Sequence, residues 1–319
     1  MTGRPLSLYR RLRRRAWWLV VVVVLFCFRL VPLALGRRLG SALGLLALRV
    51  RPRERRRARE NLTLAFGELA PRQREELLKA TAGTLGRNFF DNLSCARLAG
   101  NDEGFQDYPG DTERYGDFGS QLANLAGRGR GVILLTGHIG SWELLGARVA
   151  RLLERRGCGP LAVVTGTIHN PPVDAMLNRR RCRLGLRPLA RRDGIRPLFE
   201  HLRRGGVAAL LLDQKLSQQD PPSRFFGEPA PTPDGMARMA RKLQVPILPV
   251  AMAWDGASGR HTIQRLPVLN APSPRADDRG NEVRQVARLQ QEAQDSLEEF
   301  VRRNPEQWVW FHERWATKG

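Results

Sequence analysis

The feature that most constrains the fold is a regular alternation of short apolar runs with longer segments of helical periodicity. Strand-like runs occur at 131–136, 161–165, 207–213 and 246–254, and a run at 261–269 alternates as an edge strand does. Helical candidates lie near 71–98, 141–156, 172–184, 195–204, 233–243 and 280–303. Fully apolar strands are typical of a sheet with both faces covered. We therefore predict an α/β fold with a central, mostly parallel or mixed sheet flanked by helices.

Composition agrees with a folded chain and argues against nucleic acid as a partner. With 319 residues, 42% of them hydrophobic, the chain can bury a substantial core. The formal charge of +22 is typical of proteins that bind phosphate backbones. However, residues 1–59 contribute +15 of that charge, which leaves only +7 for the rest of the chain. The excess charge thus flanks a hydrophobic segment, and we expect no nucleic-acid partner.

That hydrophobic segment predicts one membrane anchor near the N-terminus. Its uninterrupted apolar part, Ala16 to Phe28, would span about 20 Å as a helix, short of the roughly 30 Å hydrocarbon core. Extended to Leu35 it reaches that thickness if Arg29 snorkels to an interface. The alternative is a secretory signal peptide, but no A-x-A cleavage site follows.

The anchor sets the expected domain organisation. We expect an arginine-rich N-terminus with the anchor at 1–36, a basic juxtamembrane segment at 37–60 and a catalytic domain at 61–319. The juxtamembrane segment either lies along the bilayer surface or packs on the catalytic domain, and the sequence leaves both open. The four cysteines have neither C-x-x-C nor metal-ligand spacing, and no Gly-x-Gly-x-x-Gly or Walker loop occurs. We expect no metal and no cofactor.

Two polar residues follow the apolar run at 131–136 and suggest a reactive site. In "GHIGSWE", Gly137 permits a turn, His138 lies at the carboxyl end of the strand, and Glu143 lies in the first turn of the next helix. Open α/β sheets place ligand crevices at that end of the strands. A carboxylate beside an imidazole fixes its tautomer and stabilises its charged form. The pattern also fits a turn histidine with an acid favoured by the helix dipole, and spacing alone does not decide.

Six blocks in order give the sequence its likeness to a known family. They are "RENLTLAFGELAPRQREELL", "GHIGSWE", "NRRRCRLGLRPL", "LLLDQK", "RFFGEPAPTPDGMARMA" and "PEQWVWFHERW". The chain resembles the bacterial lipid A biosynthesis acyltransferases, the late lauroyl and myristoyl transferases of the lysophospholipid acyltransferase superfamily, over nearly its whole length. The resemblance implies a glycerolipid acyltransferase-like fold. Departures at Gly67, Asp234 and the "WFHERW" ending put the identity of the acceptor in doubt.

The resemblance assigns expected roles to the catalytic pair and to an arginine. His138 and Glu143 match the His-x4-Asp/Glu motif, with His138 as the base and Glu143 as the group that orients its ring. Arg181, or backbone amides near Gly137, would stabilise the oxyanion. Arg181 would otherwise bind an acceptor phosphate, or remain a solvated charge within "RRRCR".

Further expected site residues come from two other blocks. Asp213 and Gln214 would face the crevice or simply end their strand, and Phe226 and Gly227 would shape the groove. The aromatic cluster near the C-terminus is expected to pack or to touch lipid, and its members are Trp308, Trp310, Phe311 and Trp315. The remaining histidines are expected to be surface or core residues, and they are His169, His201, His261 and His312.

The implied reaction is transfer of an acyl chain from a thioester, on acyl carrier protein or coenzyme A, to a hydroxyl of a phosphorylated membrane glycolipid. The favoured acceptor is a lipid A precursor, and another lysophospholipid or glycolipid is the alternative. Because acyl thioesters are made in the cytosol, we expect the catalytic domain on the cytoplasmic side of the bacterial inner membrane. A non-enzymatic protein that binds membranes or nucleic acid through residues 1–59 is the competing class.

Overall fold

A computed structural model of the protein describes residues 16, 18, 19, 23, 30–166, 170–215, 223–272 and 281–315. Within these residues, seven strands pair in the order β1-β9-β8-β2-β5-β3-β4. The strands are β1 (Phe105–Asp107), β2 (Val132–Thr136), β3 (Leu161–Thr165), β4 (Leu186–Ala190), β5 (Val207–Leu211), β8 (Ile247–Asp255) and β9 (Arg260–Arg265). All neighbours pair in parallel except β8 and β9. The predicted α/β fold with a mostly parallel sheet is confirmed.

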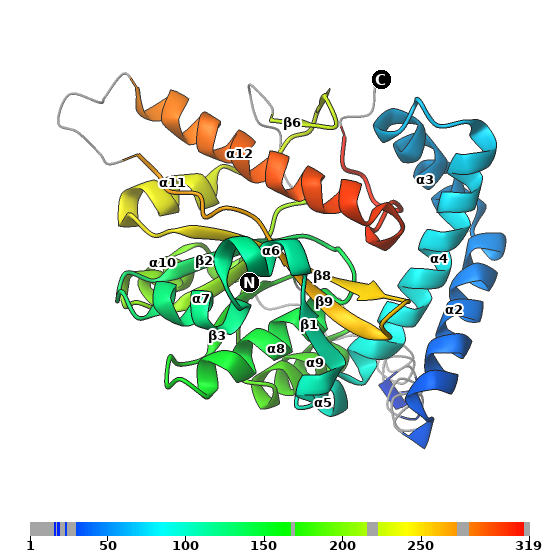
Figure 1. Ribbon diagram of the computed structural model, residues 1–319, viewed down its shortest axis with the longest axis horizontal. Helices are drawn as coiled ribbons and strands as arrows, with labels where there is room; N and C mark the ends of the chain where they lie inside the picture. The colour runs from blue at the N-terminus through cyan, green and yellow to red at the C-terminus, as the bar shows by residue number, and fades with distance from the viewer. Residues whose placement is uncertain are drawn as a thin grey trace, which may run out of the picture.

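Helices cover both faces of this sheet (Figure 1). One face carries α10 (Arg196–Arg203), α11 (Gly235–Leu243) and α12 (Glu282–Arg303). The opposite face carries α5 (Cys95–Leu98), α7 (Phe118–Ala126) and α8 (Trp142–Glu154). The connections also contain α6 (Pro109–Tyr115), α9 (Pro171–Arg183), the short helices η1 (Asp102–Gly104) and η2 (Arg191–Asp193), and the hairpin of β6 (Arg224–Phe225) and β7 (Glu228–Pro229). Each face therefore has its own hydrophobic core.

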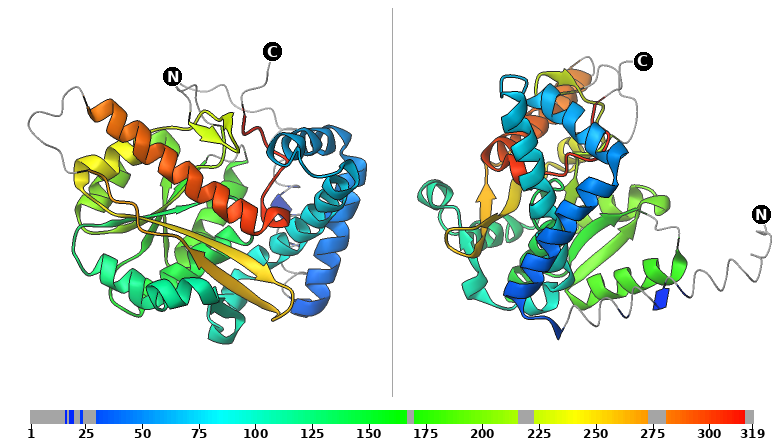
Figure 2. Two further views of the ribbon diagram at one scale, coloured as in Figure 1. Left: turned by 45° about the horizontal axis from the view of Figure 1, so that its top comes forward. Right: turned by 90° about the vertical axis from the view of Figure 1, so that its right-hand side faces the viewer.

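The three N-terminal helices form a layer beside the sheet, as both views of Figure 2 show. They are α2 (Leu33–Val50), α3 (Pro52–Ala65) and α4 (Pro71–Leu93). Small residues let α2 and α4 approach closely, because a Cβ on Gly40 would lie 2.5 Å from the carbonyl oxygen of Gly86. The outer side of α2 keeps large apolar side chains exposed, namely Leu35, Leu39, Leu43, Leu46 and Val50. The juxtamembrane segment thus packs on the catalytic domain by one side only.

The described residues contain no helix that is long and apolar enough to cross a bilayer. Half of the predicted anchor, residues 16–35, lies outside the described part of the chain, including most of its apolar stretch at 16–28. The division into 1–36, 37–60 and 61–319 stays a prediction.

The sequence placed one strand incorrectly. The run at 261–269 was expected at an edge, yet β9 lies between β1 and β8 because the three-residue strand β1 covers it. In this interior position, polar groups of β9 form hydrogen bonds with neighbouring side chains. The Nε2 of Gln106 lies 3.0 Å from the hydroxyl of Thr262, and the amide of Arg265 donates to Asp111 at 2.6 Å.

Candidate active site

His138 and Asp213 form a hydrogen-bonded pair at the carboxyl ends of adjacent parallel strands. Strand β2 ends at Thr136 and β5 ends at Leu211, and these two residues are paired in register. The chain then brings His138 Nδ1 within 2.8 Å of Asp213 Oδ1. The backbone amide of His138 donates to Asp213 Oδ2 at 2.6 Å. One carboxylate therefore fixes both the ring and the backbone of the histidine.

The surroundings of Asp213 leave little room for change. A Cβ on residue 137 would lie 2.9 Å from Asp213 Oδ2, so Gly137 is required by this close approach rather than by a sharp turn. The indole Nε1 of Trp308, which follows η4 (Pro305–Gln307), donates to the same oxygen at 2.8 Å. Because the amide of His138 is occupied by Asp213, it is not free to bind an oxyanion, which weakens the expectation for backbone amides near Gly137.

The pair shifts the pKa values of both partners. Burial alone would lower the pKa of His138, but the charge and hydrogen bond of Asp213, together with the charge of Glu143, raise it above its usual value. Burial would raise the pKa of Asp213, yet the charge and hydrogen bonds of His138 hold it well below its usual range. Asp213 is thus ionised throughout the physiological range, and His138 is an unusually basic imidazole.

Glu143 does not orient the His138 ring, which corrects the expectation from the sequence. Its carboxylate is bound by Arg181 through two contacts, one from Nη2 to Oε1 and one from Nε to Oε2 at 3.2 Å. The Glu143 side chain, in the first turn of α8, contacts Arg181 of α9. The His138 ring is instead contacted by Asp213, which follows the end of β5. Arg181 is therefore held as one half of a bidentate ion pair and is not a solvated charge.

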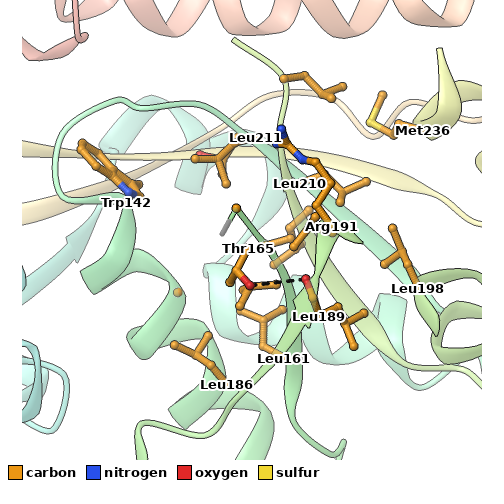
Figure 3. Close-up of a pocket in the computed structure, with 18 of the residues that line it drawn as sticks. Trp142, Leu161, Thr165, Leu186, Leu189, Arg191, Leu198, Leu210, Leu211 and Met236 are labelled. Carbon is orange, nitrogen blue, oxygen red and sulfur yellow. Dashed lines mark hydrogen bonds between the residues drawn. The ribbon is translucent and has the colours of Figure 1, made fainter. Parts of the chain in front are cut away.

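A cavity of about 690 Å³ opens beside His138 and is lined mainly by apolar side chains (Figure 3). Glu143, Arg181 and Gln214 lie on its wall. The side-chain nitrogen of Gln214 lies 3.4 Å from His138 Nε2, the ring nitrogen that Asp213 leaves unoccupied. The volume is within the range of small-molecule sites. Gln214 thus faces the crevice as expected, whereas Asp213 is buried behind His138 and is not among the residues that line the cavity.

The cavity also contains a hydroxyl that was not among the site residues expected from the sequence. Thr136 lines the cavity, and its buried Oγ1 has no hydrogen-bond partner within the described residues. Thr136 is the last residue of β2 and comes two residues before His138, and both residues line the cavity. No motif identified it, because a threonine that ends a buried strand is common.

Phe226 and Gly227 are not among the residues that line the cavity, and their expected role as a packing element that shapes the groove stays a prediction. They form the turn between β6 and β7 with φ of 53° and 74°. Positive φ at both central positions is typical of tight hairpin turns, and Gly227 adopts it without strain. The Phe226 ring packs 6.2 Å from the ring of Trp310, so this block supports the C-terminal segment.

The C-terminal segment packs as expected, and it also contributes to the site. Trp308 and Trp310 are fully buried, and the Asn61 side chain of α3 donates to the carbonyl oxygens of Trp310 and His312 at 2.7 and 3.0 Å. The His312 ring then lies 5.4 Å from the His138 ring, between centroids. Sequence spacing missed both Trp308 and His312, because each comes to the site only through the fold.

His312 is neutral at physiological pH. Burial lowers the pKa of His312 to about 4, opposed by the charge of Asp213 and reinforced by that of His138. The ligand atoms of His138, Asp213 and His312 lie within 4.8 Å of one another, a spacing from which a metal ion can be bound. However, Asp213 already accepts three hydrogen bonds from His138 and Trp308, and the His312 ring, whose Nε2 has no hydrogen-bond partner within the described residues, lies beside this network.

The other histidines lie in the interior or outside the described residues. His201 lies with its Nε2 3.0 Å from the carbonyl oxygen of Val207, and His261 is buried 3.3 Å from Asp91. His169 falls in the part that the structure does not describe. The site therefore consists of an activated imidazole, a fixed guanidinium and an apolar cavity, an arrangement that can remove a proton from a lipid-like substrate.

Comparison with known proteins connects this site to a family. Residues 6–317 match the family described as bacterial lipid A biosynthesis acyltransferase. A lipid A biosynthesis acyltransferase of Haemophilus influenzae is 24% identical over 305 residues, which cover 95% of this chain and 87% of the relative. A lipid A biosynthesis myristoyltransferase of Escherichia coli is 31% identical over 142 residues, 44% of this chain and 41% of the relative.

A third relative has a different name. A phosphatidylinositol mannoside acyltransferase of Mycobacterium tuberculosis is 25% identical over 193 residues, 59% of this chain and 56% of the relative. The family match extends over nearly the whole chain and includes every residue of the site. The chain is an acyltransferase and belongs to the bacterial lipid A biosynthesis acyltransferase family.

Proposed function

We propose that this protein transfers a fatty acyl chain from an acyl thioester to a hydroxyl of a lipid A precursor. The observation that carries the proposal is the His138–Asp213 pair at the wall of an apolar cavity. The base needs no serine or cysteine nucleophile, because the acceptor supplies its own hydroxyl. The names of the relatives in Haemophilus influenzae and Escherichia coli support a lipid A acceptor.

The proposed step begins with proton transfer to His138. The acceptor oxygen bonds to the thioester carbonyl carbon while its proton moves to Nε2, and Asp213 stabilises the imidazolium through Nδ1. The tetrahedral intermediate then collapses, the carbon–sulfur bond breaks, and the leaving thiolate takes the proton from Nε2. The products are an ester and a free thiol, and His138 returns to its neutral form.

Arg181 is the proposed donor to the oxyanion or to an acceptor phosphate. Its guanidinium lines the cavity and is fixed in place by Glu143. A donor held before the reaction contributes about 2.7 to 4 kcal/mol of barrier lowering in comparable sites. We assign Glu143 the role of positioning Arg181, and its charge also increases the basicity of His138. The hydroxyl of Thr136 is a second proposed donor in the cavity.

Membrane association is part of the proposal. The exposed leucines of α2 form an apolar face, and arginines such as Arg38 and Arg49 lie on the same helix. A face of this kind suits a bilayer surface with anionic headgroups, and the apolar segment before it suits an anchor. Acyl carrier protein and coenzyme A are the proposed donors, which places the catalytic domain at the cytoplasmic side of the inner membrane.

The test uses the full chain purified in detergent with a lipid A precursor. Acyl carrier protein and coenzyme A carrying the same acyl chain are supplied separately, and free thiol is measured together with the mass of the acceptor. We expect His138→Ala to lower thiol release and acceptor acylation by about 10²- to 10⁴-fold. Arg72→Ala, at an exposed position on α4, is the matched control and should keep full activity.

Two results would contradict the proposal. One is full transfer by His138→Ala with an unchanged unfolding temperature, which would remove His138 from the chemistry. The other is acylation of a different glycolipid and not of the lipid A precursor. The name of the Mycobacterium tuberculosis relative is the reason to include such a glycolipid among the acceptors tested.

A further inference from the structure

The cavity beside His138 extends over both faces of the central sheet. On the α8 face it is lined by Leu134, Val149 and Leu186, which belong to the core beneath α8. On the opposite face it is lined by Leu198 and Met236, which belong to the core beneath α10 and α11. We call these parts the α8 arm and the α11 arm. Figure 3 shows Leu186 and Met236 at opposite sides of the cavity.

The passage between the arms is a gap between two strands of the sheet. Pairing of β3 with β5 includes Val163 and Ala209 and goes no further. By contrast, β5 stays paired with β2 as far as Leu211, and β3 stays paired with β4 as far as Thr165. The residues beyond the last β3–β5 pair line the cavity, and they are Val164, Thr165, Leu210 and Leu211. The separated strand ends therefore connect the two faces.

The volume exceeds what one acyl chain of ordinary length needs. A protein cavity of about 150 Å³ holds benzene, which corresponds to about 25 Å³ for each buried carbon. The 690 Å³ cavity would then accommodate roughly 28 carbons. A myristoyl chain, as the name of the Escherichia coli relative specifies, contains 14 carbons, about half of that capacity.

We infer that the two arms hold two different acyl chains, the donor chain in the α8 arm and a chain already attached to the acceptor in the α11 arm. The inference rests on the proposed function. The His138 ring lies 5.0 Å from the ring of Trp142, the first residue of α8, so the reacting carbonyl lies at the entrance to that arm. A donor chain begins at the reacting carbon, whereas a chain of the acceptor begins several bonds from the reacting hydroxyl.

A cationic group at the second arm suits an acceptor with a phosphorylated headgroup. Arg191 lines the cavity, and Figure 3 shows its side chain beside Leu210 and Leu211. Its planar guanidinium can bind a phosphate through two hydrogen bonds while the lipid chain enters the gap. Arg181 is paired with Glu143 of α8 and lies near His138, so the two arginines line different parts of the cavity.

Two glycines provide a matched pair of test positions. Gly146 of α8 lines the α8 arm, and a Cβ there would lie 3.4 Å from Leu186. Gly235 of α11 lines the α11 arm, and a Cβ there would lie 3.4 Å from Ile195. Both are ordinary contacts, and neither glycine has a positive φ. Gly146→Leu and Gly235→Leu therefore each narrow one arm, and the alanine variants serve as controls for folding.

The experiment measures two properties of the full-length enzyme in detergent. Transfer rates with acyl-coenzyme A donors of increasing chain length give the preferred length of the donor chain. Transfer rates at increasing concentrations of a lipid A precursor, with the donor concentration held constant, give the acceptor KM. We expect Gly146→Leu to shorten the preferred donor chain by roughly four carbons, the size of the added side chain, with little change in acceptor KM. We expect Gly235→Leu to raise acceptor KM at least about tenfold and to leave the preferred donor length unchanged.

A second measurement on the unmodified protein guards against variants that fail to fold. A donor with a photoreactive group at the end of its chain should label the peptides of the α8 arm that contain Val149 or Leu186. Labelling of the Met236 peptide would show that one chain crosses the sheet, and so would a shorter preferred donor for Gly235→Leu. Either result, or an unchanged acceptor KM in Gly235→Leu, overturns the inference. Absence of thiol release by the unmodified enzyme with every donor would instead contradict the proposed function.

Discussion

Two acidic residues lie close to His138, and their surroundings differ sharply. The Asp213 side chain is 1% exposed and accepts hydrogen bonds from the ring and amide of His138 and from Trp308. The Glu143 side chain is 32% exposed and is bound by Arg181. The comparison shows that the acid nearest in sequence positions the arginine, while the acid 75 residues away positions the base.

Burial explains why the two acids are not interchangeable. A buried carboxylate is stable only when its lone pairs are satisfied, so Asp213 and its three donors form one unit whose parts cannot be removed separately. The pair of Glu143 and Arg181 is partly exposed to water, which screens it and tolerates substitution better. Variants of the two acids should therefore differ in how much activity they lose.

The largest effect is expected for Asp213→Asn. The amide keeps the shape of the carboxylate but removes its charge and favours the wrong tautomer of His138, which should lower kcat by about 10³- to 10⁴-fold. Steady-state transfer rates give the measurement. Asp295→Asn, at an exposed position on α12, is the control with unchanged kcat. A loss under tenfold for Asp213→Asn would show that Asp213 is structural only.

A smaller effect is expected for Glu143→Gln. Without the carboxylate, Arg181 loses its fixed position, and we expect kcat/KM to fall by about ten- to a hundredfold. The double variant Glu143→Gln with Arg181→Gln should be close to Arg181→Gln alone, because both changes remove the same unit. Additive losses in this double-mutant cycle would instead indicate that Glu143 acts on His138 independently.

Trp308→Phe should have a weaker effect again. The ring volume largely remains, but Asp213 Oδ2 loses its indole donor, so the free energy of unfolding should fall by about 1 to 3 kcal/mol. Chemical denaturation measures this change. Trp315→Phe is the control variant, because the Trp315 indole donates to the carbonyl oxygen of Phe225. This variant should lose about as much stability without a change in kcat. Equal kcat in both variants would show that the indole of Trp308 does not support the catalytic carboxylate.

The smallest effect concerns pH. Protonated His138 cannot accept a proton, so kcat/KM should rise with pH through the pKa of His138, which is raised above the usual value of an imidazole. Because the charge of Glu143 is among the groups that raise this pKa, Glu143→Gln should move the rise toward lower pH. The pH profile of both proteins checks the shift. A move toward higher pH would contradict the electrostatic role of Glu143.

Much of the fold followed from hydrophobic periodicity. The run at 161–165 is β3, and the helix expected near 172–184 is α9 (Pro171–Arg183). Strand β4 was missed because its sequence, "LRPLA", places an arginine and a proline in a short edge strand that is only partly buried. Strand β1 was missed for a different reason, since three residues are too few to show alternation.

The site was predicted in part. His138, Arg181 and Gln214 were selected by motif, and the structure brings all three to one cavity. The partner of the imidazole was chosen wrongly, because helix spacing suggested Glu143 while strand adjacency brings Asp213 to the ring. No sequence rule connects Trp308 or His312 with a histidine so far away in the chain. Such contacts depend on tertiary packing.

The indole that holds Asp213 comes from the last part of the chain. Domains fold from the N-terminus while synthesis proceeds, so β2 and β5 can pair before the segment around Trp308 has left the ribosome. Until that segment packs between α3 and the hairpin, the carboxylate lacks one donor and the wall of the site near His312 is missing. The order of synthesis thus completes the site last, and a protein truncated before Trp308 would retain the pair of His138 and Asp213 without the indole donor and without the side of the site near His312.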